Sequence, residues 1–259
     1  MIDEIDIDML DSDGPIALID ADSLMYYEMG KDTLEEAIKG IDSRILQILD
    51  KCNTARYAGF LTLGKCFRYR IAKTKPYKHN RKGGNKPIIF YALKEYLQQK
   101  WKFTAVKGLE ADDLVSIYKR SINSVVCSPD KDVLYQVVGS HYNYGKAEFV
   151  RTNEETADKF LLMQMLMGDS TDGIIGIPKV GPKTAEKWVQ ERAYLTMVLE
   201  KYQEKFGLAE GINRFVETFN LVYLLRTPLE ASQILGHDLE PLVYHNVQQL
   251  IPMIDASEM

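Results

Sequence analysis

The chain has few of the residues that mark secreted, zinc-binding or membrane proteins. Its 259 residues include three cysteines, Cys52, Cys66 and Cys127, which have no metal-ligand spacing and whose odd number argues against a disulfide framework. The four histidines are scattered, which disfavours a zinc site. No apolar run approaches the roughly 18 residues that span a bilayer, and the N-terminus is acidic where a signal peptide is basic. We therefore expect a soluble cytoplasmic protein without membrane contact, and a monomer by default.

Charge is distributed unevenly along the chain, although the net charge is only -5. Between Lys65 and Lys102 there are twelve Lys or Arg residues and one acid, Glu95. The first fourteen residues have the opposite bias, since they contain no base and the acids Asp3, Glu4, Asp6, Asp8, Asp11 and Asp13. We expect residues 1–14 to form an acidic disordered leader and the basic stretch to face a polyanion.

The hydrophobic patterns predict an α/β domain followed by a helical region. Strands that alternate with helices form parallel sheets, so we expect a central, mostly parallel sheet flanked by helices over residues 15–150. Pro76 and Gly83-Gly84 interrupt the basic stretch, which favours an arch at about 65–102. Residues 151–259 have mainly helical patterns. The expected strands are 16–20, 57–63, 103–106 and 124–128, and the expected helices are 32–51, 88–101 and 110–120.

Acidic residues recur at the ends of these predicted elements. Asp20 and Asp22 follow the first strand, and Asp130 and Asp132 follow the strand at 124–128. Ligands of an open α/β sheet bind outside the carboxyl ends of its strands. Side chains two apart in an extended segment point the same way, so each pair can share one target. The other acids at element ends are Glu110, Asp112, Asp113, Asp169 and Asp172.

Nine converging carboxylates would repel one another unless cations neutralise them, so the pattern favours divalent metal ions. Ligands that are all oxygen indicate Mg²⁺, with Mn²⁺ as a substitute. Two such ions can activate a water and stabilise the leaving oxygen of a phosphodiester. Each cluster also has a structural explanation. Acids at 110–113 complement a helix dipole, and those at 130–132 and 169–172 suit turns and caps.

The glycine-rich segment Gly176-Ile-Pro-Lys-Val-Gly181-Pro-Lys-Thr-Ala185 is similar to a phosphate-binding P-loop, but Pro182 breaks the spacing. It fits better as a hairpin between two helices at about 168–190, with a simple glycine-rich turn as the alternative. Backbone N–H groups and a lysine at a helix N-terminus suit one DNA phosphate. The candidate DNA-binding residues here are Lys179, Val180, Gly181, Lys183 and Thr184.

Aromatic and basic side chains alternate in the basic stretch, at Phe67-Arg-Tyr-Arg70 and Tyr77-Lys-His-Asn-Arg-Lys82. This composition suits single-stranded nucleic acid, because bases stack on rings while cations follow the phosphates. The alternative is a charged helical surface. The candidate DNA-binding residues of the stretch are Arg68, Arg70, Tyr77, Lys78, Arg81 and Lys82.

Five segments, in this order, resemble the 5′-3′ exonuclease and flap-endonuclease family, and above all its compact phage members. They are Leu18-Ile-Asp-Ala-Asp22, Tyr77-Lys-His-Asn-Arg81, Gly108-Leu-Glu-Ala-Asp-Asp113, Ser128-Pro-Asp-Lys-Asp132, and Gly168-Asp-Ser-Thr-Asp-Gly173 running into Gly176–Ala185. The resemblance implies a PIN-like nuclease core, a helical arch over the active site, and a C-terminal helical region with a helix-hairpin-helix (H3TH) DNA-binding motif.

The resemblance also implies roles for individual residues. Asp20, Glu110, Asp112 and Asp113 would hold a first Mg²⁺ ion, and Asp130, Asp132, Asp169 and Asp172 a second. Lys78 and Arg81 would act on the scissile phosphate beside the catalytic Asp130 and Asp132. A K⁺ ion near Val180 is a further implication for the hairpin.

The implied activity is two-metal hydrolysis of phosphodiesters by a 5′-3′ exonuclease and flap endonuclease in DNA replication or repair. Its substrates would be DNA with a free 5′ end, such as flaps, nicks and recessed ends, and the RNA of RNA-DNA hybrids. No polymerase region follows, so replication proteins are expected as partners in trans, in the host cytoplasm if a phage encodes the chain. The alternatives are a non-catalytic DNA-junction-binding protein and a PIN-type endoribonuclease.

One departure concerns the segment Leu61–Lys65, which has no carboxylate where family members commonly carry another metal-binding Asp. We hypothesise that Asp22 takes over part of that role. A second departure is Gly173-Ile-Ile175 where relatives more often have Asn-Ile-Pro, and we expect a local change only.

Overall fold

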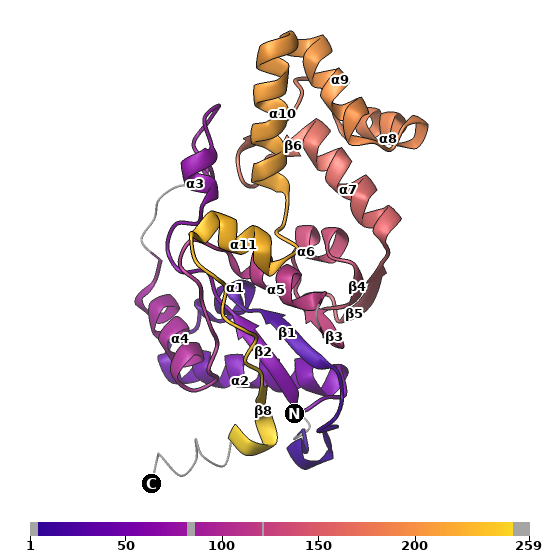
Figure 1. The fold of residues 1–259 in the computed structure, drawn as a ribbon. Helices are drawn as coiled ribbons and strands as arrows, with labels where there is room; N and C mark the ends of the chain where they lie inside the picture. Colours follow the sequence, from indigo (N-terminus) through magenta and orange to yellow (C-terminus); the bar gives the residue numbers. More distant parts are fainter. Residues whose placement is uncertain (1–4, 82–85, 121, 251–259) are drawn as a thin grey trace.

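A computed structural model describes residues 5–81, 86–120 and 122–250, and shows an α/β layer below a projecting helical region (Figure 1). The elements up to residue 152 are η1 (Ile7–Met9), β1 (Ile16–Asp20), α1 (Asp22–Glu28), α2 (Leu34–Lys51), β2 (Arg56–Phe60), α3 (Arg68–Ile71), α4 (Ile88–Gln99), α5 (Ala111–Lys119), β3 (Ser124–Cys127), α6 (Lys131–Gln136), β4 (Gly139–Asn143) and β5 (Glu148–Thr152). All of them belong to the layer except α3, which lies against α10 of the helical region. The later elements are α7 (Glu154–Met167), β6 (Gly168–Asp169), β7 (Ile174–Ile175), α8 (Pro182–Glu191), α9 (Leu195–Phe206), α10 (Leu208–Val222), α11 (Pro228–Leu235) and β8 (His245–Asn246).

The main sheet has the strand order β5-β4-β3-β1-β2-β8. Strand β1 lies at its centre and pairs in parallel with both β2 and β3, and β3 pairs in parallel with β4. The two outer pairs, β4 with β5 and β2 with β8, are antiparallel. The prediction of a mostly parallel sheet is thus confirmed, and the carboxyl ends of β1, β2 and β3 lie together at one edge.

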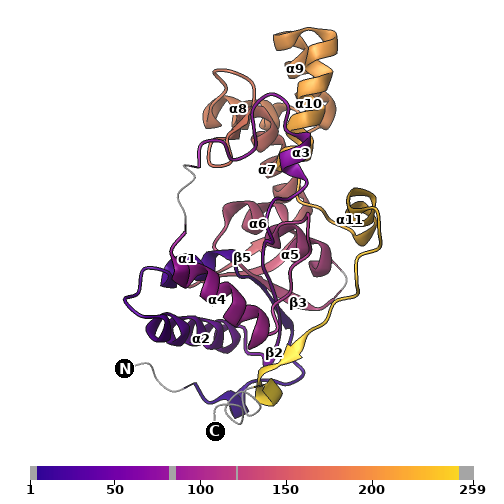
Figure 2. The same ribbon diagram turned by 90° about the vertical axis from the view of Figure 1, so that its left-hand side faces the viewer.

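The central strand is buried on both faces, which explains its continuous apolar sequence. Ala17 and Ile19 pack with residues of α2 and α4 in one core cluster, and Ile16 and Leu18 pack with residues of α5 in another. The alternation follows from the two-residue period of a strand. Figure 2 shows α2 and α4 together on one side of the sheet. Asp20 is the last residue of β1, so it lies at the carboxyl end of a central strand of the sheet.

Several local predictions differ from the structure because tertiary contacts decide them. The segment 103–106 is not a strand. Thr104 makes only an isolated parallel bridge with Phe60, while Phe103 packs in the core. The helix predicted at 88–101 is α4, and its buried Phe90, Leu93 and Leu97 place it in the helical layer and not in a free arch. The hairpin of β4 with β5 was not among the predicted elements.

Both ends of the described chain are packed against the sheet. Leu10 is buried in the core, and the side-chain amide of Gln248 donates to the carbonyl oxygens of Ile7 and Leu10 at 3.0 Å each. The prediction of a disordered leader is therefore wrong for residues 5–14, while residues 1–4 lie outside the described part. Strand β8 returns the C-terminal segment to β2, so the region after 151 is not helical throughout.

The helical region has its own core, formed mainly by α7, α8, α9 and α10. Between α7 and α8 lies the short hairpin of β6 and β7. A side chain at Gly168, where φ is 74°, would meet the carbonyl oxygen of Ile174 at 2.3 Å, and one at Gly176 would meet the nitrogen of Gly168 at 2.3 Å. Two glycines thus allow the close backbone contact that holds Asp169 and Asp172 in place.

None of the helices in the described ranges combines the length and the apolar character needed to cross a membrane.

The buried His141 of β4 leads to a prediction about acid stability. Its Nε2 lies 2.6 Å from the carbonyl oxygen of Val137, and burial lowers its pKa to about 4. The unfolded chain therefore binds a proton at a higher pH than the folded protein does, so stability is lost as the pH falls from about 6.5 towards 4. Between about pH 7.5 and about pH 5, we expect His141 to account for about 2 kcal/mol of lost stability.

Denaturant unfolding at both pH values will measure this effect. His141→Gln should reduce the pH dependence of the unfolding free energy, whereas the exposed His237→Gln should leave it unchanged. An equal pH dependence in the wild type and His141→Gln would show that other groups control acid stability.

Candidate active site

The end of β1 carries the first part of the site. Asp20 accepts a hydrogen bond from the Ser128 hydroxyl at 2.7 Å and one from the Asp22 N–H at 3.3 Å. Burial, followed by the charges of Asp22 and Asp130, raises the pKa of Asp20 to about 7. Asp22 begins α1 and does not continue the strand. The prediction that Asp20 and Asp22 lie two apart on one extended segment is therefore wrong. It remains next to Asp20, and it also accepts the N–H of Thr62 at 2.9 Å.

The start of α6 carries the second part. Asp130 caps this helix by accepting the N–H of Asp132 at 2.7 Å, so these two acids do not lie on one extended segment either. Burial and the charge of Asp130 raise the pKa of Asp132 to about 7. Lys131 reaches Asp169 with Nζ 3.0 Å from Oδ2. The acids after β3 and the acids of the hairpin therefore share one electrostatic environment.

The start of α5 carries the third part. Glu110, Asp112 and Asp113 each offer a carboxylate oxygen within 4.8 Å of the others. Burial raises the pKa of Asp112, and Glu110 and Asp113 add to the rise. Burial alone would also raise the pKa of Glu110, but Arg68 and Lys78 lower it to about 2. Glu110 is the N-cap of α5, and its N–H donates to Asp113 Oδ2 at 3.3 Å. The same two acids therefore cap the helix and belong to the acidic cluster.

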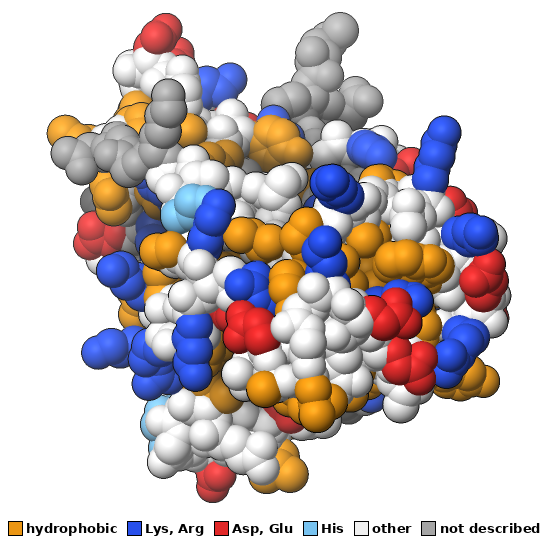
Figure 3. Space-filling model, turned by 90° about the horizontal axis from the view of Figure 1, so that it is seen from above, with side chains coloured by type: hydrophobic (Ala, Val, Ile, Leu, Met, Phe, Trp, Pro, Cys, Tyr) orange, Lys and Arg blue, Asp and Glu red, His pale blue; other side chains and the backbone are white. Residues whose placement is uncertain are grey.

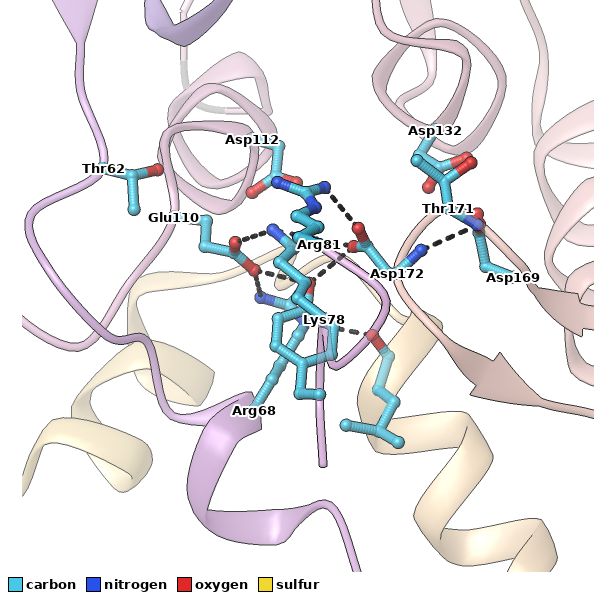
Figure 4. Close-up of polar contacts among 12 residues, drawn as sticks. Thr62, Arg68, Lys78, Arg81, Glu110, Asp112, Asp132, Asp169, Thr171 and Asp172 are labelled. Atoms are coloured by element: carbon cyan, nitrogen blue, oxygen red, sulfur yellow. Dashed lines mark hydrogen bonds and ion pairs between the residues drawn. The ribbon is translucent and has the colours of Figure 1, made fainter. Parts of the chain in front are cut away.

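The base of the predicted arch joins the start of α5 to the hairpin after α7 (Figure 4). Lys78 Nζ lies 2.5 Å from Glu110 Oε1 and 3.7 Å from Asp172 Oδ2, and Arg81 Nη2 lies 2.5 Å from Asp172 Oδ1. The N–H of Lys78 donates to the carbonyl oxygen of Asp172 at 2.8 Å and holds Lys78 at a left-handed φ of 56°. Strained backbone of this kind gathers at functional sites. Residues 77–81 and the hairpin at 169–172 thus meet over the sheet edge.

Four predicted DNA-binding residues of the basic stretch have different outcomes. Arg68 is 1% exposed and is bonded to Glu110 and Asp113, so its prediction as a DNA contact is wrong. Tyr77 is also buried, and its hydroxyl donates to Glu110 at 2.9 Å and to Asp172, so it orients carboxylates and does not stack on bases. Lys82 lies outside the described residues. Arg70 is exposed and stays a candidate.

The hairpin loop and the start of α8 keep most of the predicted phosphate-binding residues accessible. Lys179, Lys183 and Thr184 are exposed, and Gly181 caps α8 before Pro182. The N–H of Lys183 belongs to the first turn, which a helix leaves without an internal acceptor. The N–H of Val180 instead donates to Ile177 at 3.1 Å, so its predicted role as a free donor is corrected.

A hollow of about 390 Å³ separates the arch base from this loop and is lined by both segments, including His79, Asn80, Lys179 and Val180. The upper face of the molecule carries Lys and Arg side chains among apolar and acidic ones (Figure 3).

The acidic site fits hard divalent cations. The donors are carboxylate oxygens, and several of the acids have a raised pKa because burial and neighbouring charges disfavour their ionised forms. Asp20, Asp112 and Asp132 are the acids that most need a compensating charge. Asp113 lies in the cluster as predicted, but both of its oxygens accept bonds from Arg68.

Several residues of the site were not predicted. Ser128 bonds to Asp20, Lys131 to Asp169, and the amide of Gln164 donates to Asp132 at 2.8 Å. Thr62 accepts the N–H of Ala111 at 3.0 Å through its hydroxyl and so joins the end of β2 to α5. The positions of Ser128 and Lys131 beside Asp130 were a usable signal. Gln164 and Thr62 stand apart from the acids in sequence and carry no such signal.

Comparison with solved structures identifies the fold. The structure is similar to a pseudo-enzyme-product complex of the bacteriophage T5 flap endonuclease with DNA and metal ions, at a TM-score of 0.65 and 16% identity over 95% of this chain and 100% of that one. The catalytic core of Rad2 in complex with DNA substrate gives a TM-score of 0.54 at 14% identity, over 93% and 84% of the two chains. The chain has the fold of these two proteins.

Sequence comparison finds relatives among exonucleases. Residues 155–249 match the model of the 5′-3′ exonuclease C-terminal SAM fold. A 5′-3′ exonuclease of Buchnera aphidicola (subsp. Acyrthosiphon pisum) is 33% identical over 138 residues, which are 47% of this chain and 47% of that protein. An exodeoxyribonuclease of Enterobacteria phage T3 is 30% identical over 123 residues, 44% of this chain and 40% of that protein. The chain is thus similar in sequence to 5′-3′ exonucleases, as its motifs predict, and it spans less than half the length of these two relatives.

Proposed function

We propose that this protein is a structure-specific 5′ nuclease, a 5′-3′ exonuclease and flap endonuclease that hydrolyses phosphodiesters of DNA with a free 5′ end. Two Mg²⁺ ions, for which Mn²⁺ can substitute, would activate the attacking water and stabilise the leaving oxygen. Asp20, Glu110 and Asp112 would hold one ion. Asp130, Asp132, Asp169 and Asp172 would surround the other.

The observation that carries the proposal is the convergence of these acids with two cations of the arch base. Lys78 and Arg81 reach Glu110 and Asp172, so their positive charges lie beside the carboxylates, where a phosphate would have to bind. Fixed cations in a partly buried site gain value as negative charge grows on the reacting phosphate. The exposed lysines of the hairpin, Lys179 and Lys183, would hold duplex DNA through its phosphates without reading bases.

Finer assignments belong to the same proposal. Nicks, recessed ends and the RNA of RNA-DNA hybrids are further substrates, replication proteins are partners, and the chain acts as a monomer. A K⁺ ion at the hairpin near Val180 is also proposed. Asp22 would assist the first metal site, because it lies beside Asp20 and bonds to Thr62 in the segment without a carboxylate. An experimental structure with Mn²⁺ in which Asp22 points away from the ions would contradict this role.

One assay tests the proposed function. The protein is incubated with end-labelled 5′-flap DNA and with single-stranded RNA, each with Mg²⁺ and with EDTA. We expect Mg²⁺-dependent cutting of the flap near its junction. Binding of the flap without cutting would instead indicate a non-catalytic junction-binding protein, and cutting of RNA alone would indicate a PIN-type endoribonuclease.

A further inference from the structure

The buried Arg68 connects three separate parts of the structure. It begins α3, and its Nη1 donates to Asp113 Oδ2 at 2.7 Å and to Glu110 Oε2 at 3.1 Å. Its Nη2 donates to Asp113 Oδ1 at 2.7 Å and to the carbonyl oxygen of Tyr223 at 2.8 Å. Its Nε donates to the carbonyl oxygen of Leu221 at 3.0 Å. A guanidinium group has five N–H donors, so these five bonds use all of them.

Each carboxylate oxygen of Asp113 accepts two hydrogen bonds. Oδ1 accepts the N–H of Leu225 at 3.2 Å in addition to Arg68, and Oδ2 accepts the N–H of Glu110 in addition to Arg68. The residue is 0% exposed, so its charge is balanced inside the protein by the bidentate contact with Arg68. This pairing sets Asp113 apart from the more accessible Asp112 on the same helix.

We propose that Arg68 is a positioning residue of the metal site, which orients Glu110 through Asp113 and through its direct bond to Glu110 Oε2. The same guanidinium holds the end of α10 against the start of α5, so the arch base, the acidic cluster and the helical region depend on one side chain. The effect of Arg68 on DNA cutting rests on the proposed nuclease function. Replacing a residue that hydrogen-bonds to a metal ligand changes metal affinity or activity by roughly 10–100-fold.

Arg68→Lys is the decisive variant, because it keeps the positive charge beside Asp113 and changes the geometry. A lysine has three donors on one nitrogen and cannot pair with both oxygens of Asp113 while reaching two carbonyl oxygens. We expect its Mn²⁺ affinity, measured by calorimetric titration without DNA, to fall roughly 10-fold or more. Far-UV circular dichroism should show a native fold. Arg120→Lys, at the exposed far end of α5, is the matched control and should bind Mn²⁺ like the wild type.

The outcomes separate a positioning role from other roles. A folded Arg68→Lys variant with wild-type Mn²⁺ affinity would overturn the proposal. So would a loss of flap binding with unchanged Mn²⁺ affinity, since Arg68 would then support the DNA-binding surface and not the metal site. If Arg68→Lys does not fold, Asp113→Asn keeps the size of the side chain and removes the charge that Arg68 holds, and it must show the same weakening of Mn²⁺ binding for the proposal to stand.

Failure of the nuclease function would be visible separately. A wild-type protein that binds Mn²⁺ but leaves the flap uncut refutes the proposed function, while the effect of Arg68→Lys on Mn²⁺ binding can still be measured. A wild-type protein that binds no Mn²⁺ overturns both proposals.

Discussion

Replacing Asp130 by Asn is expected to abolish flap cutting while DNA binding is retained. Asp130 lies at the start of α6, where its charge raises the pKa of both Asp20 and Asp132, so it stands between two groups of acids. Loss of this carboxylate should lower the cutting rate by more than about 100-fold. Replacing a residue that only hydrogen-bonds to a metal ligand has a smaller effect, of roughly 10–100-fold. Asn has nearly the same size and can still accept the N–H of Asp132, so the helix cap should persist.

The measurement is the single-turnover cutting rate of 5′-flap DNA in Mg²⁺, together with flap binding in EDTA by fluorescence anisotropy. Asp238→Asn serves as the control, because Asp238 is exposed in the irregular segment between α11 and β8. Normal turnover by Asp130→Asn would contradict the assignment of this acid to the metal site. A joint loss of binding and cutting would indicate a structural role.

Replacing Lys78 by Met is expected to lower the cutting rate by roughly 10²–10³-fold, the range found when one fixed group that stabilises developing charge is removed. Lys78 contacts Glu110 and Asp172, so its ammonium group belongs to the centre of the site. Burial by itself would lower the pKa of Lys78, but the charges of Glu110 and Asp172 have the larger combined effect and raise it. Lys78 therefore stays protonated at neutral pH. Its charge is therefore available when negative charge develops on a phosphate.

The effect should appear in the rate of the chemical step more than in substrate binding, because an interaction that strengthens in the transition state changes kcat. Lys51→Met is the control. Lys51 is exposed at the end of α2, separated by four residues from the start of β2, and thus lies near the opposite end of the parallel strands. A large rise in KM with unchanged kcat would show that Lys78 only binds DNA.

Local patterns in the sequence were enough to predict the strand ends that carry the acids. Ile16–Asp20 reads as a buried strand because both of its faces are apolar, and it is the central strand β1. The motif at Gly108–Asp113 predicted the start of α5, and the glycines at 168 and 176 fall where the hairpin backbone makes its closest contact. Such features depend on neighbours in the chain, which is why they could be predicted without a structure.

Charge alone could not show which basic residues face DNA and which face the protein. Arg68 and Arg70 are two residues apart in the same basic stretch, yet Arg68 is buried against Asp113 and Arg70 is exposed. The difference arises because α10 ends beside α3 and offers two carbonyl oxygens to the guanidinium group. No local pattern contains that contact, since 153 and 155 residues separate Arg68 from its two carbonyl partners.

The sequence by itself determined the α/β class, the acidic strand ends and the resemblance to the 5′-3′ exonuclease family, because periodicity and short motifs are properties of contiguous residues. Only the tertiary structure decided that the arch base meets the hairpin through Lys78 and Asp172, that Tyr77 and Arg68 support carboxylates, and that β8 returns to the sheet. These contacts join segments far apart in the chain, and they form because burying a charge or a polar group requires a partner that only the complete fold supplies.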